Sequence, residues 1–491
     1  MWRLNDPIVQ TYARLGKVLA ESSDLFRNAG PAGGLILIGS GRPTQIIDAG
    51  SLSPAVIERC SVVFVGERKA KCDLIPIRHL SGMLGTDAFL NNFRPLDRFV
   101  RMPMYLPDWS LSRPGYNDGG PGHRMYYDGV EAKVSEEIAG ITAFLDVMAF
   151  ASNADRTNAV AAALTVMLRN HFLGAKPVLA VTATKSHGGK DTIIAFARGE
   201  TPHSPISYQS TDWALERAIV GAFGHDPDLG MLVIDNARRG NNGPIQSAIL
   251  ERLATDAKPL LYSTGRFRPE RRVNDFVIAM STNEGSISED LMNRALPIHL
   301  APIGDVADRQ SPIGNPKLEY LPKHANQIAA ELRGMIERWK VAGQPLDTGA
   351  RHPFTAWAGV VGGILKANGF TDFLGNYAVR RTSDDPVRVR LALLGAERPD
   401  QWLTATEWAT VAVDQGVKDI VPVGDRTTLV AQARGMGVVL SRHQDEKFVH
   451  EGEHERLALR LTKARTRDKG EPAVRYRFAV EERADIGQSA Q

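Results

Sequence analysis

Residues 176–192 read KPVLAVTATKSHGGKDT, an apolar run followed by a loop with two adjacent glycines and a lysine. The run from Pro177 to Ala183 predicts a buried strand, and the residues from Lys190 onward predict a helix. A phosphate-binding loop needs this arrangement, because glycines let backbone amides face phosphate oxygens and the lysine adds positive charge. Taken alone, the same residues also fit an ordinary strand-to-helix turn. The stretch raises the question of a nucleotide site, and the rest of the chain must answer it.

The loop departs from the usual phosphate-binding pattern at two positions. Thr184 stands where the pattern has its first glycine, and Asp191 stands where a hydroxyl binds Mg²⁺. A carboxylate at Asp191 could bind the metal, but two like charges about 4 Å apart cost roughly 1–4 kcal/mol. Alternatively, Thr192 supplies the hydroxyl after a small shift of the helix start. The candidate nucleotide-binding residues are Thr184, Ser186, Gly188, Gly189, Lys190, Asp191 and Thr192.

Length and composition indicate a multidomain soluble protein. The chain has 491 residues, more than one hydrophobic core usually supports, so we expect two to four domains. Its 43% hydrophobic and 23% charged residues are ordinary for a globular protein. No apolar run approaches the roughly 20 residues that span a bilayer, and the first residues do not resemble a secretory signal. We therefore expect a cytoplasmic protein with no membrane partner.

Charge and cysteine content exclude little. The net charge of +3 is too small to indicate a nucleic-acid partner by itself, so local clusters of basic residues matter more. Cys60 and Cys72 are the two cysteines, and two thiols cannot make a four-ligand zinc site unaided. They fit a reducing compartment.

Helical and strand patterns alternate through the middle of the chain. Two helices are predicted between Ser135 and Phe172, with a break at ASNADRTN, and residues 175–300 then alternate apolar strands with helices. Such alternation predicts an α/β core with a mainly parallel sheet and helices on both faces. By contrast, the Gly/Pro-rich residues 112–129 predict a long loop.

Three further signals follow the glycine loop in order. Asp235 ends the apolar stretch LGMLVIDN, where a carboxylate can hold a nucleotide-bound Mg²⁺ through water. Asn283 ends DFVIAMSTN, where ring-forming ATPases place a polar residue that orients the attacking water. Arg294, in a predicted short helix before another strand, can reach a neighbouring subunit's site and offset charge in the transition state. The four signals together predict nucleotide binding.

The segments carrying these signals, with residues 95–480 around them, resemble the AAA+ ATPase region of phage- and plasmid-encoded primase-helicases. These proteins are relatives of the poxvirus-type and superfamily 3 replicative helicases. The resemblance implies an AAA+ P-loop core with a parallel sheet and flanking helices. Its domains would be a mixed α/β accessory domain at 1–130, the ATPase core at 131–310, a helical lid at 311–385 and a winged helix at 400–480.

The same resemblance implies an enzyme that uses ATP and Mg²⁺ to move single-stranded or forked DNA through a homo-oligomeric ring of about six subunits. Lys190 would neutralise the β- and γ-phosphates, Asp235 would hold Mg²⁺ with Asp191 or Thr192, and Asn283 would position water. Asn236 follows Asp235 where many AAA+ proteins have a glutamate base. The N-terminal residues look too short for a primase domain, which implies a separate primase or none.

Two basic segments are candidate DNA contacts. The first precedes the Asn283 strand and contains Arg266, Phe267, Arg268, Arg271 and Arg272, where Phe267 could stack on a base. The second is a predicted hairpin with LALRLTKARTR and VRYRFAV as its strands and DKG as its turn, and its basic residues include Arg465, Arg467 and Lys469. Solvated basic turns would look the same in sequence.

The sequence thus predicts an ATP-dependent DNA helicase or translocase of a mobile genetic element that acts in replication. Two alternatives stay open. The first is a hydrolysis-poor scaffold that uses nucleotide only for assembly, which Asp191 favours. The second is a winged-helix regulator with an ATPase module.

Overall fold

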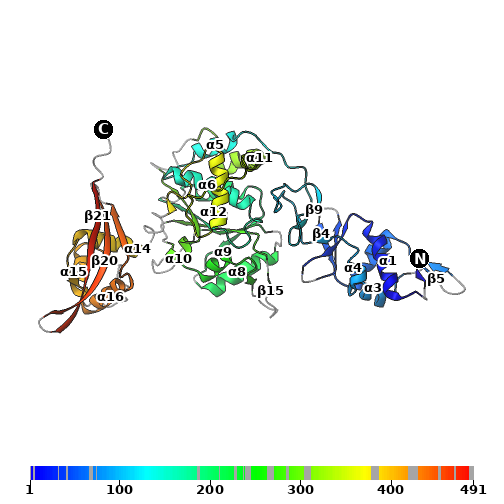
Figure 1. The fold of residues 1–491 in the computed structure, drawn as a ribbon, viewed down its shortest axis with the longest axis horizontal. Helices are drawn as coiled ribbons and strands as arrows, with labels where there is room; N and C mark the ends of the chain where they lie inside the picture. Colours follow the sequence, from blue (N-terminus) through cyan, green and yellow to red (C-terminus); the bar gives the residue numbers. More distant parts are fainter. Residues whose placement is uncertain are drawn as a thin grey trace. The chain divides into compact units, whose positions relative to one another are not determined.

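The computed structural model divides the chain into two units, Met1–Val134 and Ser135–Gln491, which are described separately below (Figure 1). Among the described residues, no helix is both long and apolar enough to cross a membrane. The described residues are 2–3, 6–30, 33–39, 42–65, 70–72, 74–184, 188–209, 211–225, 229–235, 237, 245–261, 270–271, 273–283, 287–302, 311–377, 386–417, 429–451, 455–468 and 471–485.

The first unit is a mixed α/β unit with three small sheets, ordered β4-β3-β2-β7, β1-β5-β6 and β8-β10-β9. Leu19, Leu52 and Met83, from three of its helices, pack in one buried core. The helices are α1 (Ile8–Ala20), α2 (Ala49–Arg59), α3 (Ile77–Leu84) and α4 (Asp87–Leu90). The strands are β1 (Trp2–Arg3), β2 (Leu25–Asn28), β3 (Leu35–Gly39), β4 (Arg42–Ile46), β5 (Val63–Val65), β6 (Ala70–Cys72), β7 (Pro95–Leu96), β8 (Arg98–Val100), β9 (Gly115–Asp118) and β10 (Arg124–Tyr127).

Residues 112–129 form a hairpin, so the prediction of a long loop there was wrong. Strands β9 and β10 pair antiparallel, with Tyr126 opposite Tyr116. The turn between them contains Gly120 and Gly122, whose φ angles are +89° and +84°. Glycine adopts this region without strain, so the residues that suggested a loop form the turn of a hairpin.

The core of the second unit is a five-stranded, all-parallel sheet ordered β12-β13-β16-β11-β17. This confirms the predicted α/β core. The inner strands are apolar because helices cover them, and every residue of β11 except Thr182 is buried. The strands are β11 (Val178–Ala183), β12 (His203–Ser207), β13 (Met231–Asp235), β16 (Val277–Asn283) and β17 (Ala295–Leu300), and β14 (Leu260–Leu261) pairs separately with β15 (Glu270–Arg271).

Two groups of helices flank this sheet. Helices α6 and α7 pack against each other and against β17 and β11, whereas α8 packs against α9 and β12. Helix α6 begins at Asn153, inside the predicted break, because the Ser152 side chain caps it by accepting a hydrogen bond from the Asp155 amide. The helices are α5 (Ala139–Asp146), α6 (Asn153–Met167), α7 (Lys190–Arg198), α8 (Asp212–His225), α9 (Ala248–Thr255) and α10 (Glu289–Met292).

A helical region follows the sheet. It contains the π-helical turn η2 (Pro316–Tyr320), α11 (Leu321–Val341) and α12 (Thr355–Ala367), and α12 packs on both α11 and α6. Glu331 of α11 is 1% exposed and accepts hydrogen bonds from the Gly140 and Ile141 amides, each at 2.8 Å. This carboxylate therefore caps the first turn of α5 from another helix.

The C-terminal residues form a four-stranded antiparallel sheet, ordered β18-β21-β20-β19, with three helices (Figure 1). The predicted basic hairpin is confirmed as β20 and β21. Trp408, Phe448 and Phe478 lie in the core between helices and strands. The elements are α14 (Pro386–Glu397), β18 (Leu403–Thr404), α15 (Ala405–Asp414), α16 (Leu429–Arg442), β19 (Lys447–Glu451), β20 (Glu455–Asp468) and β21 (Glu471–Asp485).

His352 is a buried histidine that joins the helical region to the parallel sheet. Its Nδ1 accepts a hydrogen bond from the Phe354 amide at 3.1 Å, so Nε2 carries the proton and donates to the Ala295 carbonyl at 3.2 Å. The rings of Phe354, Trp357 and Tyr377 surround it. Burial lowers the pKa of His352 to about 4.

His352 should make the stability of this unit depend on pH below neutrality. In the unfolded chain the histidine has a pKa of about 6.5, so the unfolded state binds more protons between pH 6.5 and 4. The contribution of His352 to the free energy of unfolding is therefore fully present above about pH 6.5. It falls by about 3 kcal/mol as the pH is lowered towards 4. Urea unfolding followed by tryptophan fluorescence should show this loss in the wild type and in His450→Gln, but a much smaller one in His352→Gln. Equal losses in all three proteins would contradict the assignment.

Candidate functional site

The carboxyl ends of three parallel strands bring the sequence-predicted residues together. Ala183, the last residue of β11, pairs with Asn283, the last residue of β16. On the other side of β16, β13 ends at Asp235, one residue after the pairing of Ile234 with Met280. Neighbouring strands lie about 4.8 Å apart, so the ends of β11 and β13 are separated by roughly 10 Å. Ligands of open α/β sheets bind beyond this edge.

Asp235 is held by a residue that the sequence analysis missed. The Ser281 hydroxyl donates a hydrogen bond to Asp235 Oδ1 at 2.6 Å, from the adjacent strand β16. Ser281 is fully buried, whereas Asp235 is exposed at the sheet edge. The strand pattern of DFVIAMSTN holds the signal for Ser281, because residues two apart on a strand face the same side.

The start of α7 lies beside the same edge. Gly189 is its N-cap residue, with φ of +92°, and as a glycine it has no side chain with which to cap the helix. The backbone amides of Thr192 and Ile193 bond to the Gly189 carbonyl, each at 3.1 Å. A helix N-terminus that follows a glycine in this way favours anions, since its first amides point outward and the helix dipole is positive there.

The remaining loop residues are placed as follows. Gly188 is buried, and Thr184 is exposed with its amide donating to the Leu300 carbonyl at 3.0 Å. Lys190 begins α7 and is only 7% exposed. Ser186 lies outside the described residues.

Asp191 pairs with a lysine that lies far along the chain. Its carboxylate is 55% exposed and lies 3.5 Å from the Nζ atom of Lys317 on η2. The contact directs Asp191 towards η2 and offsets its charge. Thr192, the alternative hydroxyl, is partly exposed in the next position of the helix.

The donor set at this edge is compatible with Mg²⁺ bound to a nucleotide. Among the described residues, no cluster of three or more His, Cys, Asp or Glu could hold a metal ion by itself. Mg²⁺ in nucleotide sites, however, is typically held by one or two protein oxygens, phosphate oxygens and water. Asp235, with Asp191 or Thr192, meets that smaller requirement.

Arg294 lies at the opposite edge of the sheet from these residues. It follows α10 instead of lying on it, and its carbonyl accepts a hydrogen bond from the Val178 amide at 2.9 Å, at the start of β11. Six residues of β17 separate it from the carboxyl edge, a distance of about 20 Å. Its Nη1 atom donates to the Asp290 carbonyl at 2.6 Å and lies 3.9 Å from Glu251 Oε2. Arg294 therefore cannot reach the Lys190 region of its own chain.

Several other predicted residues cannot be placed. Asn236, Arg266, Phe267, Arg268, Arg272 and Lys469 lie outside the described residues. The strand ends that flank the first basic segment do pair, with Leu260 opposite Arg271. Arg465 is exposed on β20, and Arg467 lies near the end of the same strand.

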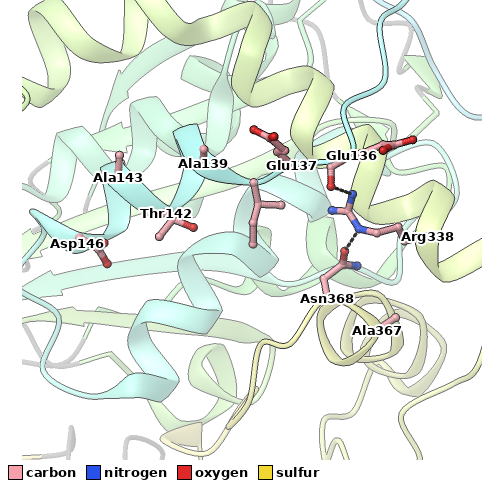
Figure 2. A pocket seen from close by; sticks show the side chains of 10 residues that line it. Glu136, Glu137, Ala139, Thr142, Ala143, Asp146, Arg338, Ala367 and Asn368 are labelled. Atoms are coloured by element: carbon pink, nitrogen blue, oxygen red, sulfur yellow. Dashed lines mark hydrogen bonds between the residues drawn. The ribbon is translucent and has the colours of Figure 1, made fainter.

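A cavity of about 770 Å³ lies between α5, α11 and the end of α12 (Figure 2). It shares no lining residue with the sheet edge. Arg338, which lines the cavity, is already hydrogen-bonded: it donates to the Glu136 carbonyl and to Asn368 Oδ1, each at 2.6 Å. The other charged residues that line the cavity are Glu136, Glu137 and Asp146, which would repel a phosphate group.

No family model and no curated protein matches the chain. Three solved structures are similar to it over most of its length, all described as apo structures of the C-terminal region of NrS-1. They have sequence identities of 12–13% and TM-scores of 0.44–0.45, and the match covers 94–95% of this chain and 98–99% of theirs. Scores this low establish neither a shared fold nor a shared function.

Replacing Gly189 should destabilise the loop at the start of α7. At φ of +92° an alanine is strained, and its Cβ would also lie 2.9 Å from Met148 Cε. We expect Gly189→Ala to lower the free energy of unfolding by about 1–3 kcal/mol. In the matched control, Gly221→Ala on α8, the new methyl group meets open space and should stabilise the helix by about 0.5–1 kcal/mol. Urea unfolding distinguishes the two, and unchanged stability in Gly189→Ala would contradict the strained conformation.

Proposed function

We propose that the protein is an ATP-dependent DNA helicase or translocase of a mobile genetic element, built on an AAA+ ATPase core. The observation that carries this proposal is the convergence of three chain segments at one sheet edge. The glycine-initiated helix with Lys190, the end of β16 at Asn283 and the end of β13 at Asp235 meet there. Their order in the sequence alone does not require that meeting.

Each residue at the edge has a role set by its chemistry. Lys190 and the amides at the start of α7 bind the β- and γ-phosphates. Asp235, oriented by Ser281, would hold Mg²⁺, and Asn283 positions the attacking water. When bound, Mg²⁺ would neutralise the charge of the phosphate oxygens. Positioning and charge stabilisation of this kind account for most of the catalysis of phosphoryl transfer.

The position of Arg294 favours assembly into a ring. An arginine that offsets transition-state charge must lie within a few ångströms of the γ-phosphate, and Arg294 is about 20 Å from that edge of its own sheet. A head-to-tail contact between identical chains can bring one subunit's amino edge to the next subunit's carboxyl edge, and repetition of that contact closes a ring. Arg294 then acts on the neighbour's nucleotide.

DNA is the proposed substrate because basic residues gather in the segment before β16 and on the C-terminal hairpin. Arg465 is exposed on β20, where it can contact a phosphate. The three helices and the basic hairpin of the C-terminal residues are consistent with a winged helix.

The contact between Asp191 and Lys317 supports a second candidate, a hydrolysis-poor scaffold. An exposed Asp191 that is turned towards Lys317 would not supply the Mg²⁺ ligand that this position of a phosphate loop usually supplies. Nucleotide would then bind and support assembly with little turnover. The two candidates differ in what the pair does to nucleotide affinity and turnover, which can be measured.

Lys190→Ala should abolish ATP hydrolysis. Loss of one charge-stabilising group from a phosphoryl-transfer site lowers kcat by about 100- to 1,000-fold. The comparison is with Lys323→Ala, which removes an exposed lysine from the surface of α11 and should leave turnover unchanged. Steady-state phosphate release, with and without single-stranded DNA, is the measurement. A Lys190→Ala protein that turns over at the wild-type rate would rule out the proposed site.

The Asp191–Lys317 pair should be coupled to nucleotide affinity. Lys317→Met leaves the Asp191 charge uncompensated near the phosphates, so we expect the Kd for Mg-ATP to rise by about 10-fold. In an Asp191→Ser background the same Lys317 substitution should have little effect. Displacement of a fluorescent ATP analogue gives the four affinities, and phosphate release gives the four rates. A wild-type rate near zero that Asp191→Ser raises would favour the scaffold, whereas additive effects on Kd would show that the pair is not coupled to the site.

A further inference from the structure

Among the residues that the structure describes, helices cover one face of the C-terminal sheet and none packs on the other. The helix-covered face supplies the strand residues of the core, and helices α14, α15 and α16 supply the rest. Side chains on a strand alternate between the two faces, so the residues between these core positions belong to the opposite face. The strand residues of the core are Phe448, Leu457, Leu459, Leu461, Tyr476 and Phe478.

The opposite face carries small residues and arginines. Thr462 of β20 pairs with Arg477 of β21, and Ala464 pairs with Arg475. All four side chains are partly exposed, whereas Leu461, Tyr476 and Phe478 beside them are buried. We call this surface, together with Trp402 before β18, the open face.

Trp402 and Arg477 form a stacked pair on the open face. The Arg477 guanidinium carbon lies 4.8 Å from the centre of the Trp402 ring. Arg477 Nε is buried and has no hydrogen-bond partner among the described residues, which is unusual for a buried donor. Arg475 donates to the Trp402 carbonyl at 3.3 Å and so holds the segment that carries the ring. The positively charged guanidinium therefore lies over the Trp402 ring, as in a cation–π pair.

Positive charge is concentrated at the Trp402 end of the sheet. At the other end, Glu481 forms ion pairs with Lys447 and Arg460, and Glu482 adds a second exposed carboxylate. Basic charge there is offset. At the Trp402 end, Arg477 lies opposite Thr462 and over the Trp402 ring. The Thr404 amide, which donates a hydrogen bond to Glu407 of α15, and the nearby Arg475 both lower the pKa of that carboxyl. The open face therefore offers an anion one favourable end and one unfavourable end.

We propose that the open face binds single-stranded DNA, with the backbone phosphates at Arg475 and Arg477 and an unpaired base stacked against the Trp402–Arg477 pair. The proposal deepens the proposed function, on which it rests for the choice of DNA. Aromatic rings and guanidinium planes are the groups on which unpaired bases stack, and the arginines complement the phosphate charge. Thr462 and Ala464 are small enough to let a strand lie close to the sheet. In a duplex the bases are already stacked, so the pair gains nothing from them.

The test is the binding of a fluorescein-labelled oligothymidylate of about 20 nucleotides to the full chain without nucleotide, by anisotropy over a series of salt concentrations. Arg477→Gln should weaken binding by about 10-fold and lower the salt slope by about 0.7, because one phosphate contact is lost. Trp402→Leu should also weaken binding by about 10-fold but leave the slope unchanged, because it removes stacking and no charge. A duplex of the same length should bind more weakly and be insensitive to Trp402→Leu.

Two further variants keep the test decisive. Arg442→Gln removes an exposed arginine from α16, on the helix-covered side, and should bind as the wild type does. Ala464→Glu places a carboxylate opposite Arg475 on the open face, where it would repel a phosphate, and should weaken binding by about 10-fold. Thermal unfolding of each variant checks that it folds. Wild-type binding by Arg477→Gln and Ala464→Glu, or an equal loss in Arg442→Gln, would overturn the proposal.

This binding measurement is independent of ATP hydrolysis. If Lys190→Ala fails to alter turnover but the open-face variants bind oligothymidylate more weakly, the proposed ATP-dependent function is wrong and the proposed DNA binding at the open face stands. If Lys190→Ala abolishes turnover and the open-face variants bind oligothymidylate normally, the ATP-dependent function stands and the DNA strand binds elsewhere.

Discussion

Parallel pairing of β16 between β11 and β13 determines where the candidate site residues lie. Because all three strands run in the same direction, their last residues meet at one edge, and the loops that follow them open on the same side. The glycine loop and Asp235 are thus kept about two strand spacings apart, with Asn283 between them.

Buried polar groups hold this arrangement at both edges of the sheet. Near the amino edge, the Lys176 ammonium donates to the Phe172 carbonyl and to two oxygens of Asn274, which ties the start of β11 to the segment before β16. Asp155 of α6 accepts the His299 amide of β17 at 2.8 Å. Each of these buried groups would be costly to leave unpaired, so they favour one register over its neighbours. The position of the site edge therefore depends on contacts that never touch a ligand.

The sequence predicted the parts of the site that depend on local pattern. Strand periodicity and the residues that end each strand gave the positions of Asp235, Asn283 and Lys190, since an apolar run followed by a polar residue is visible in a short window. Strand β12 was missed because HSPIS is short and contains Pro205. It is also the outermost strand of the sheet, where its side chains stay largely exposed. Ser281 lay within a predicted strand, but its bond to Asp235 depends on which strand pairs with which. Lys317 gave no signal, because its contact with Asp191 comes from the packing of η2 on α7.

The contact with Lys317 changes how Asp191 should be understood. From sequence alone, a carboxylate in the phosphate loop is a charge in the wrong place, and it suggests that the site has lost its activity. In the structure the same carboxylate is more than half exposed and lies beside a cation from another element, so its field at the loop is reduced by both water and Lys317. An exposed ion pair of this kind contributes only about 0–1 kcal/mol to the free energy of unfolding. The stability of the fold therefore depends little on the contact between Asp191 and Lys317. In the proposed site, a nucleotide would exclude water from the same space and strengthen every charge interaction that remains, so the pair would act more strongly on that nucleotide than on folding. The pair is therefore better understood as part of the electrostatics of the loop than as a surface salt bridge that happens to lie nearby.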